Sequence, residues 1–297
     1  MMDAFTISVL SNIGLFSFLA ISAWVLLICG EISFGQQAYF AIGAYAGGIA
    51  TAVWQWPFAL GVGFGVVLGA VIGGLVAWPT TRLSGMHYAI ATLAFAEFVR
   101  SCLNVFSYQR EVDGYLTGPD GANGFRDIRW AYEAGVEPLG YLGIIAAGLA
   151  AVIGLIACMA RGRGMAQLRI VGEDPILAGM QGLNVNRIRI AAATLAGGIA
   201  ALGGALYAHL ATYVEPAQFG VMIGVHSLAY GLIGGLGTVF GPILGVLVDI
   251  GLLESLRVFS SYRMIVFGGL VALVLILRPR GILDEKTVRR IQAWLRR

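Results

Sequence analysis

The chain alternates between long runs of uncharged, mostly apolar residues and short polar stretches. Each run approaches the ~20 residues that a helix needs to cross the hydrocarbon core of a bilayer. We therefore predict an all-α polytopic membrane protein with about eight to ten transmembrane or partial helices, some of them broken at glycine. The predicted segments cover residues 5–28, 36–54, 58–78, 86–106, 139–160, 190–212, 222–250 and 264–277.

The charges in the connecting segments predict which way the helices run. Residues 161–189 carry five arginines against Glu173 and Asp174, and residues 279–297 are also rich in arginine. Residues 107–138 instead carry six acidic residues against three arginines. Because basic loops stay on the cytoplasmic side, we predict a cytoplasmic loop at 161–189, a basic cytoplasmic tail at 279–297 and a periplasmic loop at 107–138. The N-terminus is then periplasmic, and the tail has the pattern of an amphipathic helix resting on anionic membrane lipid.

This topology requires residues 222–250 to enter the membrane and return, although the segment is too short for two full crossings. We predict two partial helices that meet at the Gly-rich residues 231–242, because non-helical backbone at membrane depth is buried in protein or lines a wet cavity. A similar interruption, at 30–37, separates two apolar halves. The pathway or gate candidates, including one carboxylate on the fourth apolar segment, are Ser33, Gly35, Gln36, Gln37, Glu97, Gly234, Gly235, Gly237, Gly241 and Pro242.

Other polar residues inside the apolar segments have structural explanations. Glu97 lies three residues before Arg100, so the two side chains can pair on one helix face, either as a latch or beside a pathway. Alternatively, because both lie near the outer end of the segment, they reach the interface by snorkelling. We expect Asp249 near the outer mouth, where the interface solvates it. Packing roles are expected for the isolated histidines and cysteines, which are His87, His209, His226, Cys29, Cys102 and Cys158.

Composition supports the membrane assignment and excludes several functions. The 297 residues are 58% hydrophobic and 12% charged, with a mean hydropathy of +0.83, which leaves no room for a separate soluble domain. The 43 glycines suit close packing of helices in lipid. A net charge of +3 is too small to indicate nucleic acid binding. We find no nucleophile, metal cluster or paired carboxylates at membrane depth, and we do not expect an enzyme or a bound cofactor.

The predicted cytoplasmic loop contains the signals of a short helix. Asp174 is placed to cap its N-terminus, Pro175 suits the first helical position, and Gly182 suits the left-handed conformation that follows the last turn. Ile176 and Leu177 share one face with Met180 and Leu183. Because an isolated helix of two turns is unstable in water, the helix either packs on its own bundle or inserts into a groove of a cytoplasmic partner.

Several motifs together resemble one known family, the LivM-type permeases, which are the membrane subunits of branched-chain amino acid ABC importers. The resemblance covers nearly the whole chain in matching order. The matching residues are 32–45, 82–97, 162–164, Arg169, 173–178, 182–185, 196–200, 206–208, 234–242 and 278–282.

This resemblance implies a permease domain at residues 5–278 in the cytoplasmic (inner) membrane of a bacterium. It also implies a sister permease subunit of the LivH type, two cytoplasmic ATP-binding subunits and a periplasmic substrate-binding protein. The residues expected to couple the chain to the ATP-binding subunits are Arg163, Arg169, Glu173, Asp174, Pro175, Ile176, Leu177, Met180 and Gly182.

The residues support one part of this expectation independently. A phosphate-binding loop needs a lysine after a spaced pair of glycines, and the only lysine, Lys286, follows Glu285 without such glycines. ATP is therefore expected to bind on partner subunits. For the substrate, branched-chain or related small amino acids stand beside urea or amides and aromatic carboxylates, and an ion-coupled secondary transporter is the alternative mechanism.

Overall fold

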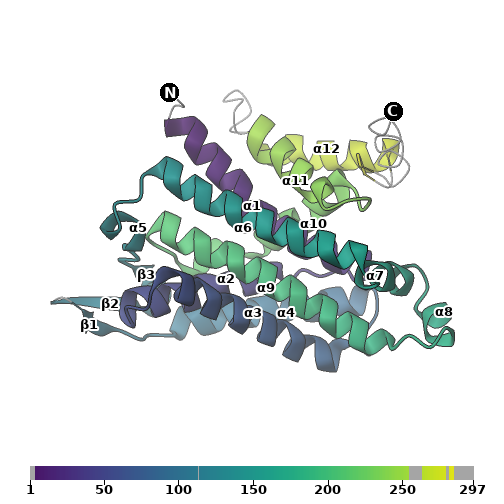
Figure 1. Ribbon diagram of the computed structural model, residues 1–297, viewed down its shortest axis with the longest axis horizontal. Coiled ribbons are helices and arrows are strands. Elements are labelled where there is room, and N and C mark those ends of the chain that lie inside the picture. The colour runs from purple at the N-terminus through teal and green to yellow at the C-terminus, as the bar shows by residue number, and fades with distance from the viewer. Residues whose placement is uncertain (1–3, 113, 254–262, 279–280, 284–297) are drawn as a thin grey trace.

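Four long apolar helices form the frame of the computed structural model, which describes residues 4–112, 114–253, 263–278 and 281–283 (Figure 1). Within that part of the chain, these four are the helices of 18 residues or more that are apolar enough to cross a membrane. They are α1 (Ala4–Ile28), α3 (Phe58–Thr80), α6 (Pro138–Arg161) and α9 (Val185–Ala211). The predicted all-α membrane fold is confirmed. A fifth long helix, α4 (Met86–Val105), is less apolar and carries Glu97 and Arg100.

Helix α9 lies at the centre of the bundle and packs against α1, α2 and α3. The seam with α3 depends on glycine, because Gly69 and Gly73 of α3 leave no room for a Cβ beside Gly197 and Ala193 of α9. Two buried hydroxyls add polar contacts to this core. Ser22 Oγ donates to the Ala196 carbonyl oxygen at 2.7 Å, and Tyr141 Oη donates to Leu206 O at 2.6 Å. Glycine is therefore a packing residue here, as the sequence indicated.

The remaining membrane-depth helices are short. Helix α2 (Gln36–Gly48) continues into the π-helical turn η1 (Ile49–Val53), and α10 (Val221–Gly234) is followed by α11 (Phe240–Val246) and the π-helical η4 (Leu247–Leu253). Helix α12 (Arg263–Leu277) is the last described helix. The run at 222–250 is thus divided into two partial helices joined by residues 235–239, as the sequence predicted.

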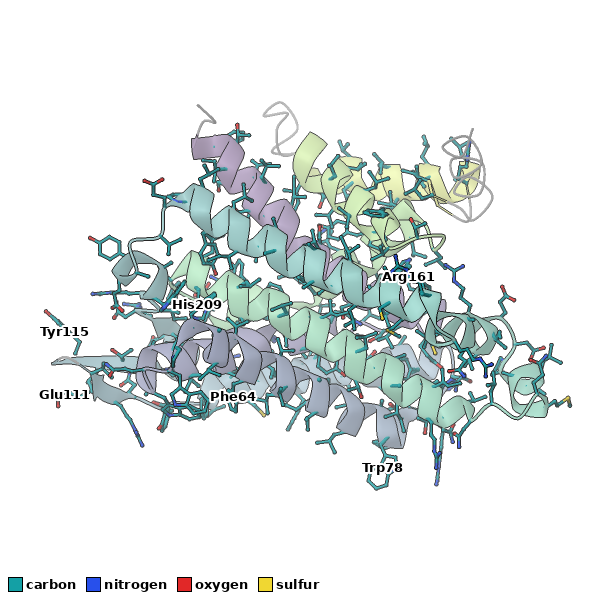
Figure 2. All side chains as sticks on the ribbon, viewed as in Figure 1. Phe64, Trp78, Glu111, Tyr115, Arg161 and His209 are labelled. Atoms are coloured by element: carbon teal, nitrogen blue, oxygen red, sulfur yellow. The ribbon has the colours of Figure 1, made fainter. Side chains whose placement is uncertain are left out.

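One end of the bundle carries a small sheet that the sequence did not predict. Strands β1 (Arg110–Val112), β2 (Tyr115–Pro119) and β3 (Phe125–Arg126) pair antiparallel in the order β1-β2-β3, beside the short elements η2 (Gly121–Asn123), α5 (Trp130–Glu133) and η3 (Pro216–Phe219). Phe125 and Ile128 are fully buried, and Phe125 N donates to Val214 O at 2.7 Å. These two buried apolar side chains anchor the loop to the bundle. We call this the sheet end; Tyr115 and Glu111 lie at its tip in Figure 2.

The opposite end carries two short helices, α7 (Gly164–Glu173) and α8 (Pro175–Met180), separated by the single residue Asp174. We call it the α7–α8 end. Arg161 lies toward it in Figure 2, while the exposed Trp78 of α3 points away from the bundle.

The structure corrects one expectation and confirms another. Asp249, expected in a solvated interface, is 1% exposed and accepts a hydrogen bond of 2.6 Å from Tyr230 Oη, because η4 packs against α10 in a buried cluster that includes Tyr230 and Ile250. His209 is a packing residue: it is fully buried, with Nε2 2.8 Å from Thr51 Oγ1 and Nδ1 2.7 Å from Ala205 O. The expected amphipathic tail helix falls on residues outside the described ones.

Candidate functional site

The first break comprises residues 30–35, which connect α1 to α2 without helical structure. Side-chain oxygens replace the missing helical acceptors: Phe34 N donates to Thr92 Oγ1 at 3.1 Å, and Gly35 N donates to Ser33 Oγ at 3.2 Å. Gly30 adopts a left-handed conformation with φ of 79°. Backbone groups freed by a break at membrane depth need such partners, so the first break is an ordered feature.

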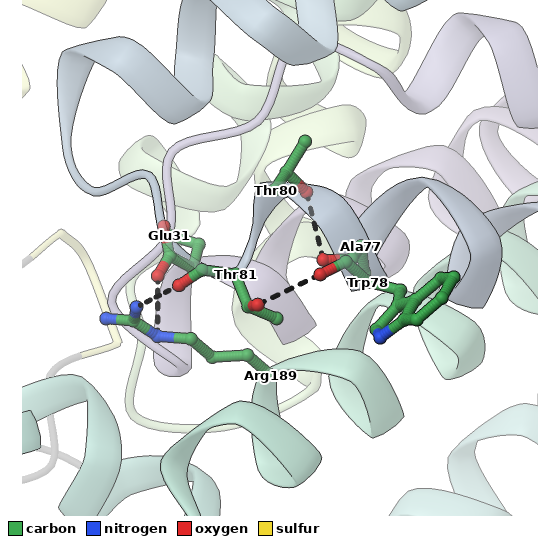
Figure 3. A network of polar contacts seen from close by, with 6 residues as sticks. All are labelled: Glu31, Ala77, Trp78, Thr80, Thr81 and Arg189. Atoms are coloured by element: carbon green, nitrogen blue, oxygen red, sulfur yellow. Dashed lines mark hydrogen bonds and ion pairs between the residues drawn. The ribbon is translucent and has the colours of Figure 1, made fainter.

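A buried ion pair holds the first break to two other helices (Figure 3). Arg189 Nε, from the first turns of α9, lies 2.8 Å from Glu31 Oε1, and Arg189 Nη1 donates to Thr81 O at the end of α3 at 3.3 Å. Glu31 is only 3% exposed. The Glu31 contact is an ion pair rather than an aligned hydrogen bond. The sequence analysis did not predict this pair. The signal that could have indicated it is Glu31, a carboxylate in the interruption between two apolar segments.

Helix α7 packs directly against the first break. A Cβ added to Gly30 would lie 2.9 Å from the Gly172 carbonyl oxygen, and one added to Gly172 would overlap the Ile28 carbonyl oxygen. The two backbones therefore touch without intervening side chains, and only glycine fits on either side of the contact.

The second break comprises residues 235–239, between α10 and α11. Gly235 has a φ of 98°, and the carbonyl oxygens of Leu236 and Gly237 accept hydrogen bonds from Arg169 Nη2 of α7 at 3.3 and 3.0 Å. Burial lowers the pKa of the Arg169 guanidinium and Glu173 opposes that shift, but an arginine keeps its charge at any physiological pH. Arg169 thus supplies donors to carbonyl groups that the break removes from the helix.

The chain returns to the second break from its C-terminal side. Ile282 N donates to Ile233 O, Leu283 N donates to Gly234 O, both at 2.9 Å, and Gly237 N donates to Leu283 O at 3.2 Å. The gate candidates of this region make close backbone contacts, since Gly234 and Gly241 lie so near each other that neither has room for a Cβ. Gly241 and Pro242 occupy the first turn of α11.

Helix α8 has the capping signals that the sequence indicated. Asp174 Oδ1 accepts from Ile176 N and Leu177 N, each at 2.9 Å. After the last turn, Gly182 has a φ of 84°, and Leu183 N donates back to Ala178 O at 3.1 Å, which completes a Schellman motif.

The apolar face of α8 is turned to the outside. Ile176 is 72% exposed, Leu177 50% and Met180 80%. These three side chains do not pack on the bundle, whereas Ala178 is fully buried and Leu183, the fourth residue of the predicted face, packs against the core. Two further coupling candidates lie at the ends of α7: Arg163 is exposed before its first turn, and Glu173 is the last residue of α7.

The polar pathway candidates beside the first break lie deep in the bundle. Gln36 and Gln37 are fully buried, and neither side-chain amide has a hydrogen-bond partner among the described residues. The side-chain amide of Gln37 packs against Gly224 of α10. Two unpaired buried amides raise the free energy of this conformation. They are therefore candidates to form hydrogen bonds in another conformation or with a substrate.

The carboxylate candidate on α4 has a different setting. Arg100 Nε donates to Glu97 Oε2 at 2.9 Å, so the predicted pairing on one helix face is present. The side chains of Arg100 and Glu97 are 34% and 33% exposed on the surface of the bundle. A partly exposed ion pair on a helix of membrane length lies either against another protein or beside water.

The described residues contain no group of three or more metal-ligating side chains. At the sheet end, Thr51, Gln55, Asp127, Arg129 and Trp130 contribute to a polar cavity of about 120 Å³.

Comparison with known proteins gives the family context. Residues 5–277 match a family model described as "Branched-chain amino acid transport system / permease component". The high-affinity branched-chain amino acid transport system permease protein LivM of Escherichia coli is 29% identical over 282 residues, which cover 86% of this chain and 64% of the relative. The chain thus spans less than two thirds of LivM.

Shorter stretches match two further permease proteins of such systems. LivH of Escherichia coli is 28% identical over 126 residues, 41% of this chain and 40% of the relative. BraD of Pseudomonas aeruginosa is 29% identical over 143 residues, 47% of this chain and 46% of the relative. No solved structure matches the chain.

Proposed function

The chain belongs to the family of branched-chain amino acid transport system permease components, and we propose that it is the membrane-spanning permease subunit of an ABC importer for branched-chain or related small amino acids. The family description supports this substrate class, and the named relatives are permease proteins of branched-chain amino acid systems. In this proposal the chain provides part of the pathway and performs no chemistry on its substrate.

The exposed apolar face of α8 is the observation that carries the proposal. A helix of six residues that leaves Ile176, Leu177 and Met180 exposed contributes little stability to its own bundle. Its capping at both ends fixes the face in place before any partner binds, which lowers the entropic cost of docking. We assign α8 as the ridge that inserts into a groove of a cytoplasmic ATP-binding subunit, with Arg163 and Glu173 at its sides.

The sequence also favours transport that is powered by ATP hydrolysis on another subunit, since it contains no phosphate-binding loop around Lys286. Two ATP-binding subunits, a LivH-type sister permease and a periplasmic binding protein complete the assembly. The α7–α8 end then faces the cytoplasm and the sheet end faces the periplasm, in a bacterial inner membrane, with a periplasmic N-terminus. The Glu97–Arg100 pair faces the sister subunit or the pathway between the two permeases.

The two breaks form the gate in this mechanism. Both lie against α7, so both are at the side where ATP binding and hydrolysis act. Closure of the ATP-binding subunits displaces α8, and the breaks change conformation and open or close the pathway. Gln36 and Gln37 offer uncharged donors and acceptors that contact a zwitterion without holding it tightly.

The test is a charge substitution on the α8 ridge in the assembled importer. The double variant Ile176→Asp with Leu177→Asp buries two carboxylates in the proposed interface, and co-purification of the ATP-binding subunits is expected to fall by about tenfold or more. The control Gln181→Asp with Asn186→Asp places two charges on nearby exposed positions and is expected to keep the subunits bound.

Two outcomes would overturn this assignment. One is retention of the ATP-binding subunits by the α8 double variant at the level of the control. The other is amino acid uptake that follows an ion gradient and needs no ATP, which is the behaviour of a secondary transporter.

A further inference from the structure

Helix α7 contacts both breaks, although they lie about two hundred residues apart in the sequence. From its C-terminal turn, Gly172 touches the backbone of the first break; from its middle, Arg169 reaches the carbonyl oxygens of the second. We propose that α7 transmits the displacement of α8 to the gate through these two contacts, and that Arg169 is the positioning residue that couples the second break to it. This inference rests on the proposed function.

The link between α8 and α7 is stiff. Only Asp174 separates the two helices, its backbone N–H donates to Ile170 O of α7 at 3.2 Å, and its side chain caps α8. A single residue bonded to both helices leaves little room for independent movement. A push on the exposed face of α8 therefore reaches α7.

The contact of Arg169 with the second break is set by unpaired carbonyl groups. Residues 235–239 are not helical, so their carbonyl oxygens need donors from elsewhere. One guanidinium nitrogen, Arg169 Nη2, serves both Leu236 O and Gly237 O. If α7 moved alone, two partly buried carbonyl groups would lose a charged donor, and leaving them unpaired would raise the free energy. The second break is therefore expected to follow the helix.

The contact with the first break works by packing. Gly172 and Gly30 lie backbone to backbone, and a Cβ added to Gly30 would lie only 2.9 Å from the Gly172 carbonyl oxygen. Compression of such a contact is opposed by steric repulsion, while the side-chain bonds of Arg169 can be broken and remade. A push of α7 toward the first break is therefore passed on by packing, whereas the second break receives it through the Arg169 side chain.

The experiment uses the complete importer in proteoliposomes and compares Arg169→Ala and Arg169→Lys with the unsubstituted chain. Arg169→Ala is expected to keep the ATP-binding subunits and their basal ATP hydrolysis but to lower uptake of radiolabelled leucine by about tenfold or more, through loss of charge-assisted hydrogen bonds. Arg169→Lys restores one charged donor and is expected to recover part of the uptake. Arg161→Ala, an exposed arginine at the end of α6, is the control and is expected to transport normally.

A direct readout separates coupling from a general loss of structure. Thr238, in the second break, is replaced by cysteine in a chain whose three cysteines are alanine, and maleimide labelling is timed with and without ATP plus vanadate. The labelling rate is expected to change on trapping, and Arg169→Ala is expected to abolish the change while ATP hydrolysis continues.

The outcomes distinguish this inference from the proposed function. Normal uptake and a normal labelling change in Arg169→Ala would overturn the role of Arg169 and leave the importer assignment intact. Failure of the unsubstituted chain to bind ATP-binding subunits would overturn the proposed function itself. Loss of the subunits in Arg169→Ala, with no rescue by lysine, would show a structural role and also contradict the inference.

Discussion

The two breaks resemble each other in sequence, since Phe34-Gly35 ends the first and Phe240-Gly241 directly follows the second, but the structure holds them in different ways. The first is braced by a buried ion pair, by hydroxyl groups and by backbone packing on α7. The second is bonded to residues 281–283 and to the Arg169 side chain, and its backbone packs closely where Gly235 meets Gly281 and Gly234 meets Gly241. The buried ion pair joins the first break to α9 and, through Thr81, to the end of α3, whereas the second break is joined to α7 through a side chain whose hydrogen bonds can be exchanged. The link between α7 and the second break is therefore the one that we expect to rearrange more readily.

Removal of one member of the buried pair at the first break should have the largest effect. Arg189→Ala leaves the carboxylate of Glu31 buried without its cation, and we expect a loss of about 3–5 kcal/mol in the free energy of unfolding. Denaturant titration of the purified protein in micelles measures it. Arg187→Ala, exposed on the same turn, should cost little.

The double variant Glu31→Gln with Arg189→Ala sharpens this test. Because it removes both charges, we expect it to be more stable than Arg189→Ala alone. Equal losses in Arg189→Ala and the Arg187→Ala control would show that the first break is not braced by this pair.

The next largest effect is expected at the contact between α7 and the first break. Gly172→Ala places a methyl group against the Ile28 carbonyl oxygen, and overpacking of this kind costs about 1–3 kcal/mol. Gly164→Ala, in the first turn of the same helix, has room, with its nearest neighbour 3.5 Å away, and should be neutral or slightly stabilising. Similar melting temperatures for the two variants would contradict close packing at Gly172.

A smaller effect is expected from the cap between α7 and α8. Asp174→Ala removes the acceptor of two backbone N–H groups, which typically costs about 1 kcal/mol. Because α8 becomes less ordered, binding of the ATP-binding subunits should weaken by about fivefold to tenfold, as measured by titration of the purified subunits. Asp174→Asn keeps the oxygen acceptor and should bind nearly as well. An alanine variant that binds like the asparagine variant would show that the cap is not needed.

The smallest effect on stability is expected beside the first break. Gln37→Leu replaces an unpaired buried amide with an apolar side chain of similar size, so the folded state should be unchanged or slightly more stable. Uptake should nevertheless fall, because the amide is expected to find partners during transport. A variant with unchanged stability and unchanged uptake would remove Gln37 from the pathway.

Local signals explain what the sequence could predict. Apolar runs of membrane length became α1, α3, α6 and α9, and the density of glycine after Gly231 located the second break within a few residues. The cap at Asp174 and the turn at Gly182 depend on neighbouring residues alone, so their types and spacing were sufficient.

The features that the sequence could not predict depend on contacts between distant segments. The pairing of Glu31 with Arg189, and of Arg169 with two carbonyl oxygens, depends on how whole helices pack. The solvation of Asp249 was predicted wrongly because its burial depends on packing against Tyr230 of another helix. The small sheet was missed because its strands are two to five residues long, too short to show an alternating pattern.

Leucine uptake by proteoliposomes that contain this chain and its sister permease, with and without the ATP-binding subunits, separates an ATP-powered importer from a secondary transporter. With saturating binding protein outside and ATP inside, we expect uptake that needs the ATP-binding subunits and stops when ATP is replaced by a non-hydrolysable analogue. Uptake that persists without these subunits, or that follows an ion gradient, would contradict the proposed function.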